Sequence, residues 1–216
     1  SKQGYKLHLN AIGTAHNGTI VVLCNYGVFR SKDNGQSWEH HPEPFREDTT
    51  PGDIVYLGPR IIDHPDHGLL AFGNTVGYVP AGTPGANYSQ NPVDAPGKFK
   101  RPSLLVLCSE DGGCSWRCID HQLPNWAAQH EPAALYFDGL LWVIGRDQIS
   151  GTDHVQMRFA SPGEAVEIQR TNMRNNRSID TVDIDFNPVT GRIEVVRSKR
   201  EDMRVDLWSI DPADWE

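Results

Sequence analysis

Several features that would assign a sequence to a class are missing here. No apolar run is long enough to cross a membrane, and the first residues lack the basic, apolar and small-residue order of a secretory signal. Only four of the 216 residues are cysteine, too few for a disulfide scaffold in a chain of this length. No stretch keeps a helical period for long. These absences argue against a membrane-spanning protein, a disulfide-rich scaffold and a fold built on long helices.

Positive charge is also scarce. The chain has 20 Lys and Arg against 28 Asp and Glu, which gives a net charge of −8. Non-specific nucleic-acid binding needs a basic face that neutralises phosphates, so we do not expect a nucleic-acid partner. An anionic sugar is still an acceptable ligand, because two or three local arginines can hold one carboxylate whatever the net charge of the chain.

The cysteines give no metal signature. Cys108, Cys114 and Cys118 cluster, but their spacing is not C-x-x-C and no second pair follows. We expect them and Cys24 to be reduced, structural thiols, with a bridge between Cys108 and Cys118 as the alternative. No histidine has further ligands at a suitable spacing, so neither a metal nor another cofactor is predicted.

What the sequence does contain is many short runs in which apolar and polar residues alternate. Turn-forming Asn, Asp, Gly and Pro separate these runs. The predicted strands are 5–9, 19–24, 27–30, 54–57, 68–72, 103–108, 133–137, 140–145, 154–159, 165–169, 181–186, 192–196 and 205–210. Strands at this spacing predict an antiparallel sandwich, barrel or propeller.

An internal repeat favours the propeller. Residues 31–38 and 109–116 both fit the pattern S-x-D-x-G-x-S-W, and both follow a predicted strand. This octapeptide resembles the Asp box of sialidases and related propellers, which lies in the hairpin between the third and fourth strands of a blade. The resemblance implies an all-β fold of four-stranded antiparallel blades, about four of which are present where sialidases have six.

The residue types of the octapeptide explain its use as a turn. The Asp can accept hydrogen bonds from nearby backbone N–H groups, the Gly can take a positive φ, and the Trp can pack under the hairpin. We therefore expect a structural role and no catalysis for Asp33, Gly35, Trp38, Asp111, Gly113 and Trp116.

The blades are expected in one domain, 1–216, at about 5–46, 52–124, 127–170 and 178–216. The first residue is not Met, so we expect either a segment of a longer protein or a ring completed by partner segments, because an open propeller exposes strand edges. Residues 75–102, with Tyr78 and Tyr88, are expected as a long loop that binds substrate; a disordered insert is the alternative.

The most informative segment for chemistry is 130–147. It is a predicted hairpin with Glu131 before its first strand and Arg146 at the end of its second, so antiparallel pairing brings the two together. The segment resembles a sialidase stretch whose Glu lies in the pocket and whose Arg grips the carboxylate of sialic acid. Its neighbour His130 is a further candidate for the pocket. A surface ion pair at the base of a hairpin is the alternative.

A second arginine follows the strand at 192–196. Arg200 matches a Ser-x-Arg-acid pattern that resembles phage endosialidases, and Arg197 is the alternative. Two arginines suit one carboxylate, because each guanidinium donates two parallel hydrogen bonds in a fixed plane.

Part of the exo-sialidase machinery has no counterpart. The family's tyrosine nucleophile follows the last carboxylate arginine, and no tyrosine follows Arg200. Either the nucleophile lies beyond Glu216, or the protein resembles phage-tailspike endosialidases, which keep one Glu and two Arg. In that pattern Glu131 acts on water or on protonation at the anomeric carbon, through an oxocarbenium-like transition state.

Three functions follow as hypotheses. The first is hydrolysis of sialylated or other acidic glycans, with Glu131, Arg146 and Arg200 as catalytic residues. The second is a non-catalytic propeller that binds glycan or protein, and the third is a structural module of a larger, tailspike-like assembly. The resemblance implies an extracellular or virion-associated location, and it leaves a homo-oligomer open.

Overall fold

The structure is a computed structural model that describes residues 9–24, 27–42, 44–45, 54–80, 98–119, 123, 132–146, 153–174, 181–199 and 204–215. These residues form antiparallel strands joined by turns. Across the described ranges, the only helical element assigned is a single 3₁₀ turn near the C-terminal end, η2 (Pro212–Asp214). The fold is therefore all-β, as the strand pattern predicted.

The strands form four consecutive groups, which we call blades 1 to 4. Blade 1 contains β1 (Leu9–Thr14), β2 (Ile20–Cys24), β3 (Gly27–Ser31) and β4 (Glu39–His41). Blade 2 contains β5 (Ile54–His64), β6 (Gly68–Pro80), β7 (Lys98–Ser109) and β8 (Arg117–Cys118). Blade 3 contains β9 (Ala133–Phe137), β10 (Leu140–Arg146), β11 (Asp153–Phe159) and β12 (Glu167–Arg174). Blade 4 contains β13 (Thr181–Asn187), β14 (Arg192–Lys199) and β15 (Arg204–Ile210).

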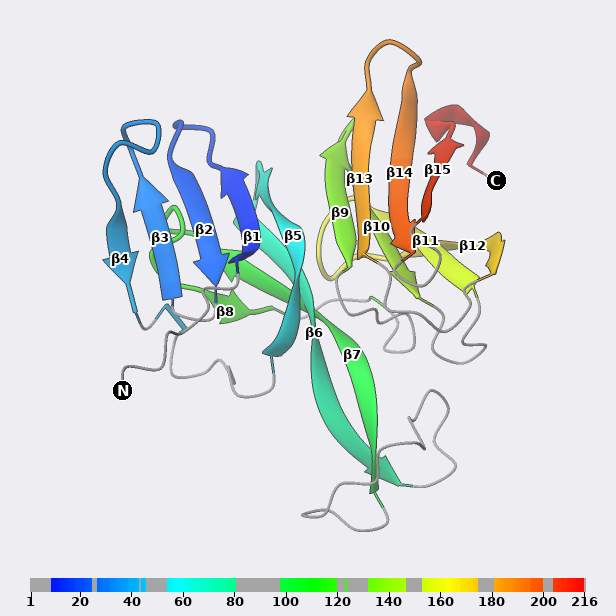
Figure 1. Cartoon of the computed structure of the whole chain (residues 1–216), viewed down its shortest axis with the longest axis horizontal. Coiled ribbons are helices and arrows are strands. Elements are labelled where there is room, and N and C mark those ends of the chain that lie inside the picture. The colour runs from blue at the N-terminus through cyan, green and yellow to red at the C-terminus, as the bar shows by residue number, and fades with distance from the viewer. Residues whose placement is uncertain are drawn as a thin grey trace.

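The first strand of each blade is the innermost one. β1 pairs in parallel with β5 at Ile12 and Arg60, so hydrogen bonding runs on from blade 1 into blade 2. β5 in turn contacts β9, and β9 contacts β13. Figure 1 shows β1, β9 and β13 pointing the same way, with the outer strands of each blade fanning away from them. This arrangement is a partial β-propeller and confirms the predicted fold class.

Three apolar clusters fill the spaces between successive blades. β10 shows why, since its side chains alternate between two neighbours. Leu141 and Val143 belong to the cluster shared with blade 2, whereas Trp142 and Ile144 belong to the cluster shared with blade 4. Because both faces of the sheet are covered, the strand reads as the continuous apolar run Leu-Leu-Trp-Val-Ile.

The strands differ from the expected ones in several places. β5 continues to His64 where 54–57 was expected, and β14 continues to Lys199 where 192–196 was expected. The first strand is β1 at Leu9–Thr14, and the expected residues 5–8 lie outside the described residues. β12 covers Glu167–Arg174 where 165–169 was expected. The outer strands β4 and β8 were not predicted, because each is only two or three residues long and mostly polar.

The loop expected at 75–102 is much shorter. β6 and β7 pair without interruption from Thr75 opposite Ser103 to Pro80 opposite Lys98, and they form a long hairpin that projects from the body of the protein (Figure 1). The β-branched residues at 75, 76 and 79 favour extended backbone, and this outweighed the nearby Gly and Pro. Residues 81–97 lie outside the described part of the chain.

The two motif tryptophans differ in burial. Trp116 is fully buried in the cluster between blades 1 and 2, and its backbone N–H donates to the carbonyl of Pro44 at 2.6 Å. Both indoles fold back on their hairpins, since Trp38 donates to the carbonyl of Gly35 at 3.1 Å and Trp116 to that of Gly113 at 3.2 Å, but Trp38 is 45% exposed. The reason is positional: blade 1 covers Trp116, whereas no blade precedes blade 1 in the described chain.

We expect Trp116→Ala to lower the free energy of unfolding by about 3–5 kcal/mol, as large truncations in a core do. Trp38→Ala is the matched control in the same motif, and its cost is expected to be about 1 kcal/mol or less. Urea unfolding of both variants measures the difference. Equal losses would contradict the assignment of Trp116, and not Trp38, to an inter-blade core.

Candidate functional site

The two octapeptides use their polar groups within the turn. Asp33 accepts hydrogen bonds from the backbone N–H of Ser37 at 2.8 Å, from the hydroxyl of Ser37 at 2.5 Å and from that of Ser31 at 2.8 Å. Asp111 accepts the equivalent three bonds from Ser115 and Ser109. Each carboxylate is thus occupied by its own hairpin and has a structural task.

These hydrogen bonds also set the acidity of the two carboxylates. The hydroxyl and the backbone N–H of Ser37 lower the pKa of Asp33 from 3.8 to about 2. Burial alone would raise the pKa of Asp111, but the hydrogen bonds from Ser115 and Ser109 outweigh it, so that this pKa is lowered too. Both groups are therefore ionised at neutral pH, and neither is poised as a general acid.

The pKa of Asp33 predicts how the first hairpin responds to acid. Since the folded pKa is depressed, the contribution of Asp33 to stability is fully present above the unfolded pKa of 3.8 and is lost as the pH falls through about 2. We expect the difference in melting temperature between the parent and Asp33→Asn to be constant from about pH 7 down to about pH 5. It should then shrink toward about pH 2. A difference that is unchanged at about pH 2 would contradict the assignment.

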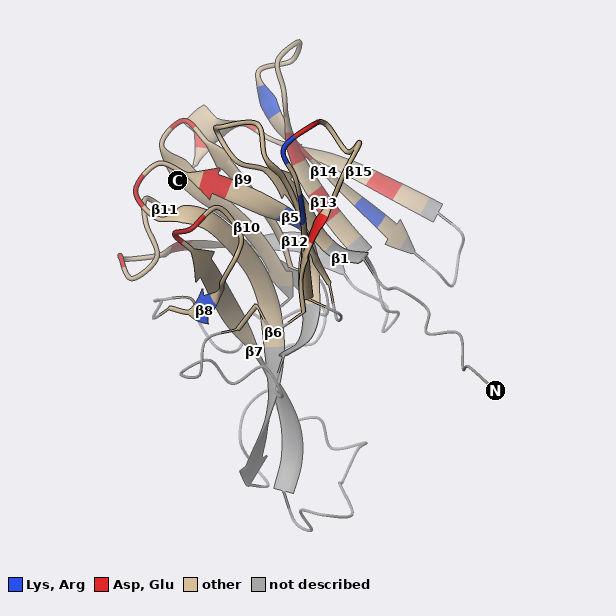
Figure 2. Cartoon of the chain, turned by 90° about the vertical axis from the view of Figure 1, so that its left-hand side faces the viewer, with Lys and Arg blue, Asp and Glu red and all other residues tan. Residues whose placement is uncertain are grey.

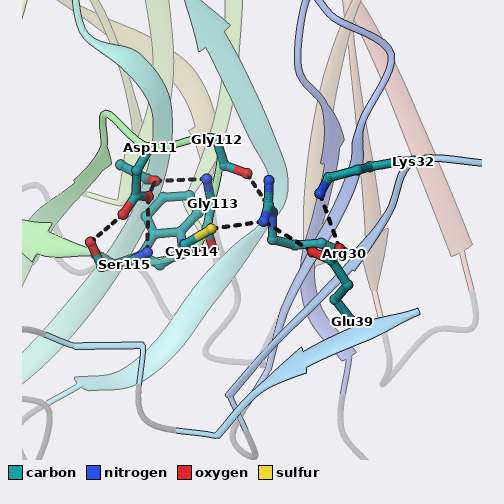
Figure 3. A network of polar contacts seen from close by, with 10 residues as sticks. Arg30, Lys32, Glu39, Asp111, Gly112, Gly113, Cys114 and Ser115 are labelled. Carbon is teal, nitrogen blue, oxygen red and sulfur yellow. Dashed lines mark hydrogen bonds and ion pairs between the residues drawn. The ribbon is translucent and has the colours of Figure 1, made fainter.

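Arg30 ties blade 1 to the second octapeptide. From β3 its Nε donates to the carbonyl of Gly112 at 2.8 Å, and its Nη1 lies 2.7 Å from Sγ of Cys114 and 3.3 Å from Oε2 of Glu39 (Figure 3). Gly113 sits in the same contact with φ +92°, and a Cβ there would lie 2.7 Å from a methyl carbon of Val21. This end of the propeller is therefore occupied by contacts between blades.

A second polar link joins the inner strands of blades 2 and 4. Arg60 of β5 donates to both carboxylate oxygens of Asp183 on β13, at 2.8 and 3.1 Å, and to Asp185 at 3.1 Å. Figure 2 shows basic and acidic positions side by side at β5 and β13. Burial alone would lower the pKa of Arg60, but the hydrogen bonds to the carboxylates raise it. The pair fixes blade 4 relative to blade 2.

Sequence reasoning missed this link. Asp183 and Asp185 alternate with the buried Val182 and Ile184, so the pattern did place the two carboxylates on the opposite face of β13. Nothing in the pattern could name their partner, which is more than 120 positions away in the chain.

Two of the predicted ligand-binding residues, Tyr78 and Arg146, lie on second strands that run toward the other end of the propeller. The second strands of the blades run antiparallel to the inner strands, and in Figure 1 β2, β6 and β14 all run toward this end. Arg146 is the last residue of β10 and lies opposite His154. Tyr78 lies near the end of β6, opposite Lys100. Glu131, His130, Tyr88 and Arg200 lie outside the described residues.

The start of β9 is also at this end, close to the axis. An ideal Cβ on Gly58 of β5 would lie only 2.0 Å from the carbonyl oxygen of Pro132, so only glycine allows this approach. The residue before β9 is thereby held against the inner strand of blade 2. Because β9 and β10 are antiparallel, β9 begins and β10 finishes at the same end of blade 3.

Arg197, the alternative to Arg200, is buried within blade 4. It shares the inward face of β14 with Ile193 and Val195, and only 1% of the residue is exposed. Its Nη2 donates to Asp206 of β15 at 2.5 Å. Alternation along Ile-Glu-Val-Val-Arg would have placed it inside, since positions 193, 195 and 197 point the same way.

The cysteines are thiols, including the pair considered for a bridge. The register of β7 and β8 explains this, because it sets Cys108 opposite Arg117 and Cys118 opposite Leu107. Within the described ranges, no group of three or more His, Cys, Asp or Glu side chains is placed to hold a metal ion. The same part of the chain contains no helix with the length and apolar character needed to span a bilayer.

No protein-family model and no curated protein matches the sequence. Among solved structures, a protein of unknown function from Dyadobacter fermentans is similar over 93% of this chain and 59% of its own length, with 14% identity and a TM-score of 0.59. That likeness concerns the fold alone.

Sialidases occur among the more distant structural neighbours. A mutant of NanB sialidase from Streptococcus pneumoniae is similar over 89% of this chain and 29% of its own length, with 16% identity and a TM-score of 0.47. Trypanosoma rangeli sialidase is similar over 96% of this chain and 47% of its own length, with 11% identity and a TM-score of 0.40. The chain thus spans about three fifths or less of each of these three proteins.

Proposed function

We propose that this propeller binds an acidic glycan at the end where β10 and β14 finish, and that it hydrolyses the glycan in the manner of a sialidase or endosialidase. The observation that carries the proposal is the register of blade 3. β9 and β10 pair from Leu140 opposite Phe137 to Ile144 opposite Ala133. We propose that this register continues for two further positions, which would pair Arg146 with Glu131.

An arginine and a glutamate that face each other at the end of a blade, near the propeller axis, can together bind an anionic sugar. The guanidinium holds a carboxylate by two parallel hydrogen bonds, and the nearby glutamate remains available for acid–base chemistry at the anomeric centre. Arg200 follows β14 directly and is the proposed second arginine. Arg197, which is buried and donates to Asp206, stays the alternative second arginine.

A non-catalytic glycan-binding propeller is the second candidate function. The observation that favours it is the sequence beyond Tyr136, which contains no tyrosine that could act as a nucleophile. In that case the same arginines bind the carboxylate, and the bound glycan is left intact.

The test uses Arg146→Ala and Glu131→Gln, with polysialic acid and a simple sialoside as substrates. Removing one bidentate arginine is expected to weaken binding by roughly 10- to 100-fold, the equivalent of about 1.5–3 kcal/mol. Glu131→Gln is expected to abolish product release and to change binding little. Arg117→Ala is the matched control, because Arg117 pairs with Glu110 at the octapeptide end.

Each outcome separates the hypotheses. Oligomer release that is lost in Arg146→Ala supports an endo-acting hydrolase. If the parent protein binds the glycan without releasing product, the result supports a non-catalytic glycan-binding propeller and contradicts the enzyme hypothesis. Binding that is equally weak in Arg146→Ala and Arg117→Ala would overturn the proposed site.

A further inference from the structure

Blade 4 has an apolar face that the described part of the chain leaves open. Val195 of β14 and Ile210 of β15 point toward blade 3 and are buried. Val196, Val205 and Leu207 alternate with these positions and point the other way, and we call these three residues the blade 4 face. Val205 and Leu207 are 69% and 65% exposed. An apolar group of this kind on a soluble protein indicates a contact surface.

The inner strand of blade 4 contributes no free apolar surface. Asp183 of β13 lies opposite Val196 on the same side of the sheet. Its carboxylate, like that of Asp185, accepts hydrogen bonds from Arg60 of blade 2. The apolar residues that a partner can reach are therefore those on the second and third strands of the blade.

Blade 1 has an open face of its own, on the side away from blade 2. β1 and β3 alternate between the cluster shared with blade 2 and this opposite side, where Ile12 and Phe29 lie. Trp38 belongs to the same side, because its counterpart Trp116 points toward the blade that precedes its own. We call Ile12, Phe29 and Trp38 the blade 1 face. Figure 1 shows blades 1 and 4 at opposite sides of the protein.

The contact between blades 1 and 2 shows what kind of surface covers an octapeptide tryptophan. Trp116 is fully buried in that contact. The residues of blade 1 in the same cluster include Val21 and Leu23 of β2 and Val28 of β3. Leu23 lies opposite Val28 in the register of the two strands. Aliphatic side chains on the second and third strands of one blade thus cover the tryptophan of the next blade.

The blade 4 face has the same layout. Val196 on its second strand lies opposite Leu207 on its third, as in the aliphatic pair of blade 1. This face is therefore suited to cover an octapeptide tryptophan, and Trp38 is the one that no blade covers within the described residues. We propose that the blade 4 face of one copy of this protein packs on the blade 1 face of a second copy. The contact continues the stacking of blades 1 to 4 from one molecule to the next.

Two different surfaces meet in this contact, so the association is heterologous, or head-to-tail. Each molecule offers one surface of each kind. The contact uses none of the arginines proposed to bind an acidic glycan, and the inference is therefore independent of the proposed function.

Sedimentation velocity of the full chain tests the association. We expect the parent to be monomeric below about 1 μM and to associate at roughly 10–100 μM, as expected for a weak specific contact. Leu207→Lys and Val205→Lys on the blade 4 face, and Trp38→Lys on the blade 1 face, should each weaken association at least tenfold, because each buries a charge in an apolar contact. Val189→Lys is the matched control, since Val189 is exposed in the turn between β13 and β14 and belongs to neither face.

A mixture of two variants distinguishes a head-to-tail contact from a symmetric one. Leu207→Lys keeps its blade 1 face, and Trp38→Lys keeps its blade 4 face. An equimolar mixture is therefore expected to form dimers at a concentration where neither variant does so alone. If one face paired with its own copy, one of the two variants would associate as the parent does, and the proposal would be wrong.

Three further results would overturn the proposal. A parent that stays monomeric at about 200 μM would mean that something other than a second copy covers the two faces. Association that Leu207→Lys and Trp38→Lys both leave intact would place the contact elsewhere. Two monomeric variants that fail to associate when mixed would contradict the pairing of the two faces. None of these results bears on Arg146, so failure here is distinguishable from failure of the proposed hydrolase.

Discussion

Blades 2 and 3 are apolar on one face toward the preceding blade and on the other face toward the next. β10 is the clearest instance, with Leu141 and Val143 packed toward blade 2 and Trp142 and Ile144 packed toward blade 4. A sheet with two apolar faces is stable only between two neighbours, so the blades must stack in a row. Their right-handed twist then turns the row into an arc around an axis. The parallel pairing of Ile12 with Arg60, and the reach of Arg60 to Asp183, follow from that arc.

The stacking also gives the two ends of the propeller different contents. At one end, the carboxylates of the octapeptide turns accept hydrogen bonds from their own hairpins. Arg30 and Gly113 make the contacts there that hold blade 1 against blade 2. At the other end the second strands finish and the inner strands begin. Arg146 ends β10 there, and β14 ends there at Lys199, because the second strand of each blade is antiparallel to the inner strand. The long β6–β7 hairpin projects from the same end.

Local patterns were enough to predict the all-β class, the blade architecture and the turn geometry of the octapeptides. Asp33 and Asp111 could be given structural tasks, because the S-x-D-x-G-x-S-W pattern contains both the acceptor and its donors. Burial that depends on a neighbouring blade was not predictable: Trp38 and Trp116 are identical within the motif, and only the cover from blade 1 separates them. The burial of Arg197 was not predicted, because the strand was expected to end at 196, whereas β14 continues to Lys199 and keeps Arg197 on the face of Ile193 and Val195. Arg60 and Trp215 carried no local signal, since their partners come from other blades.

The most direct test is to map the residues that an acidic sugar contacts when it binds the protein. Backbone amide chemical shifts can be followed while N-acetylneuraminic acid or a short polysialic acid is added. The account predicts that the shifts change at the start of β9, at the ends of β10 and β14, and in the segments that follow them, while the octapeptide turns stay constant. Changes confined to residues 31–38 and 109–116, or no changes at saturating oligosaccharide, would contradict the placement of the site and the claim that this propeller binds acidic glycans.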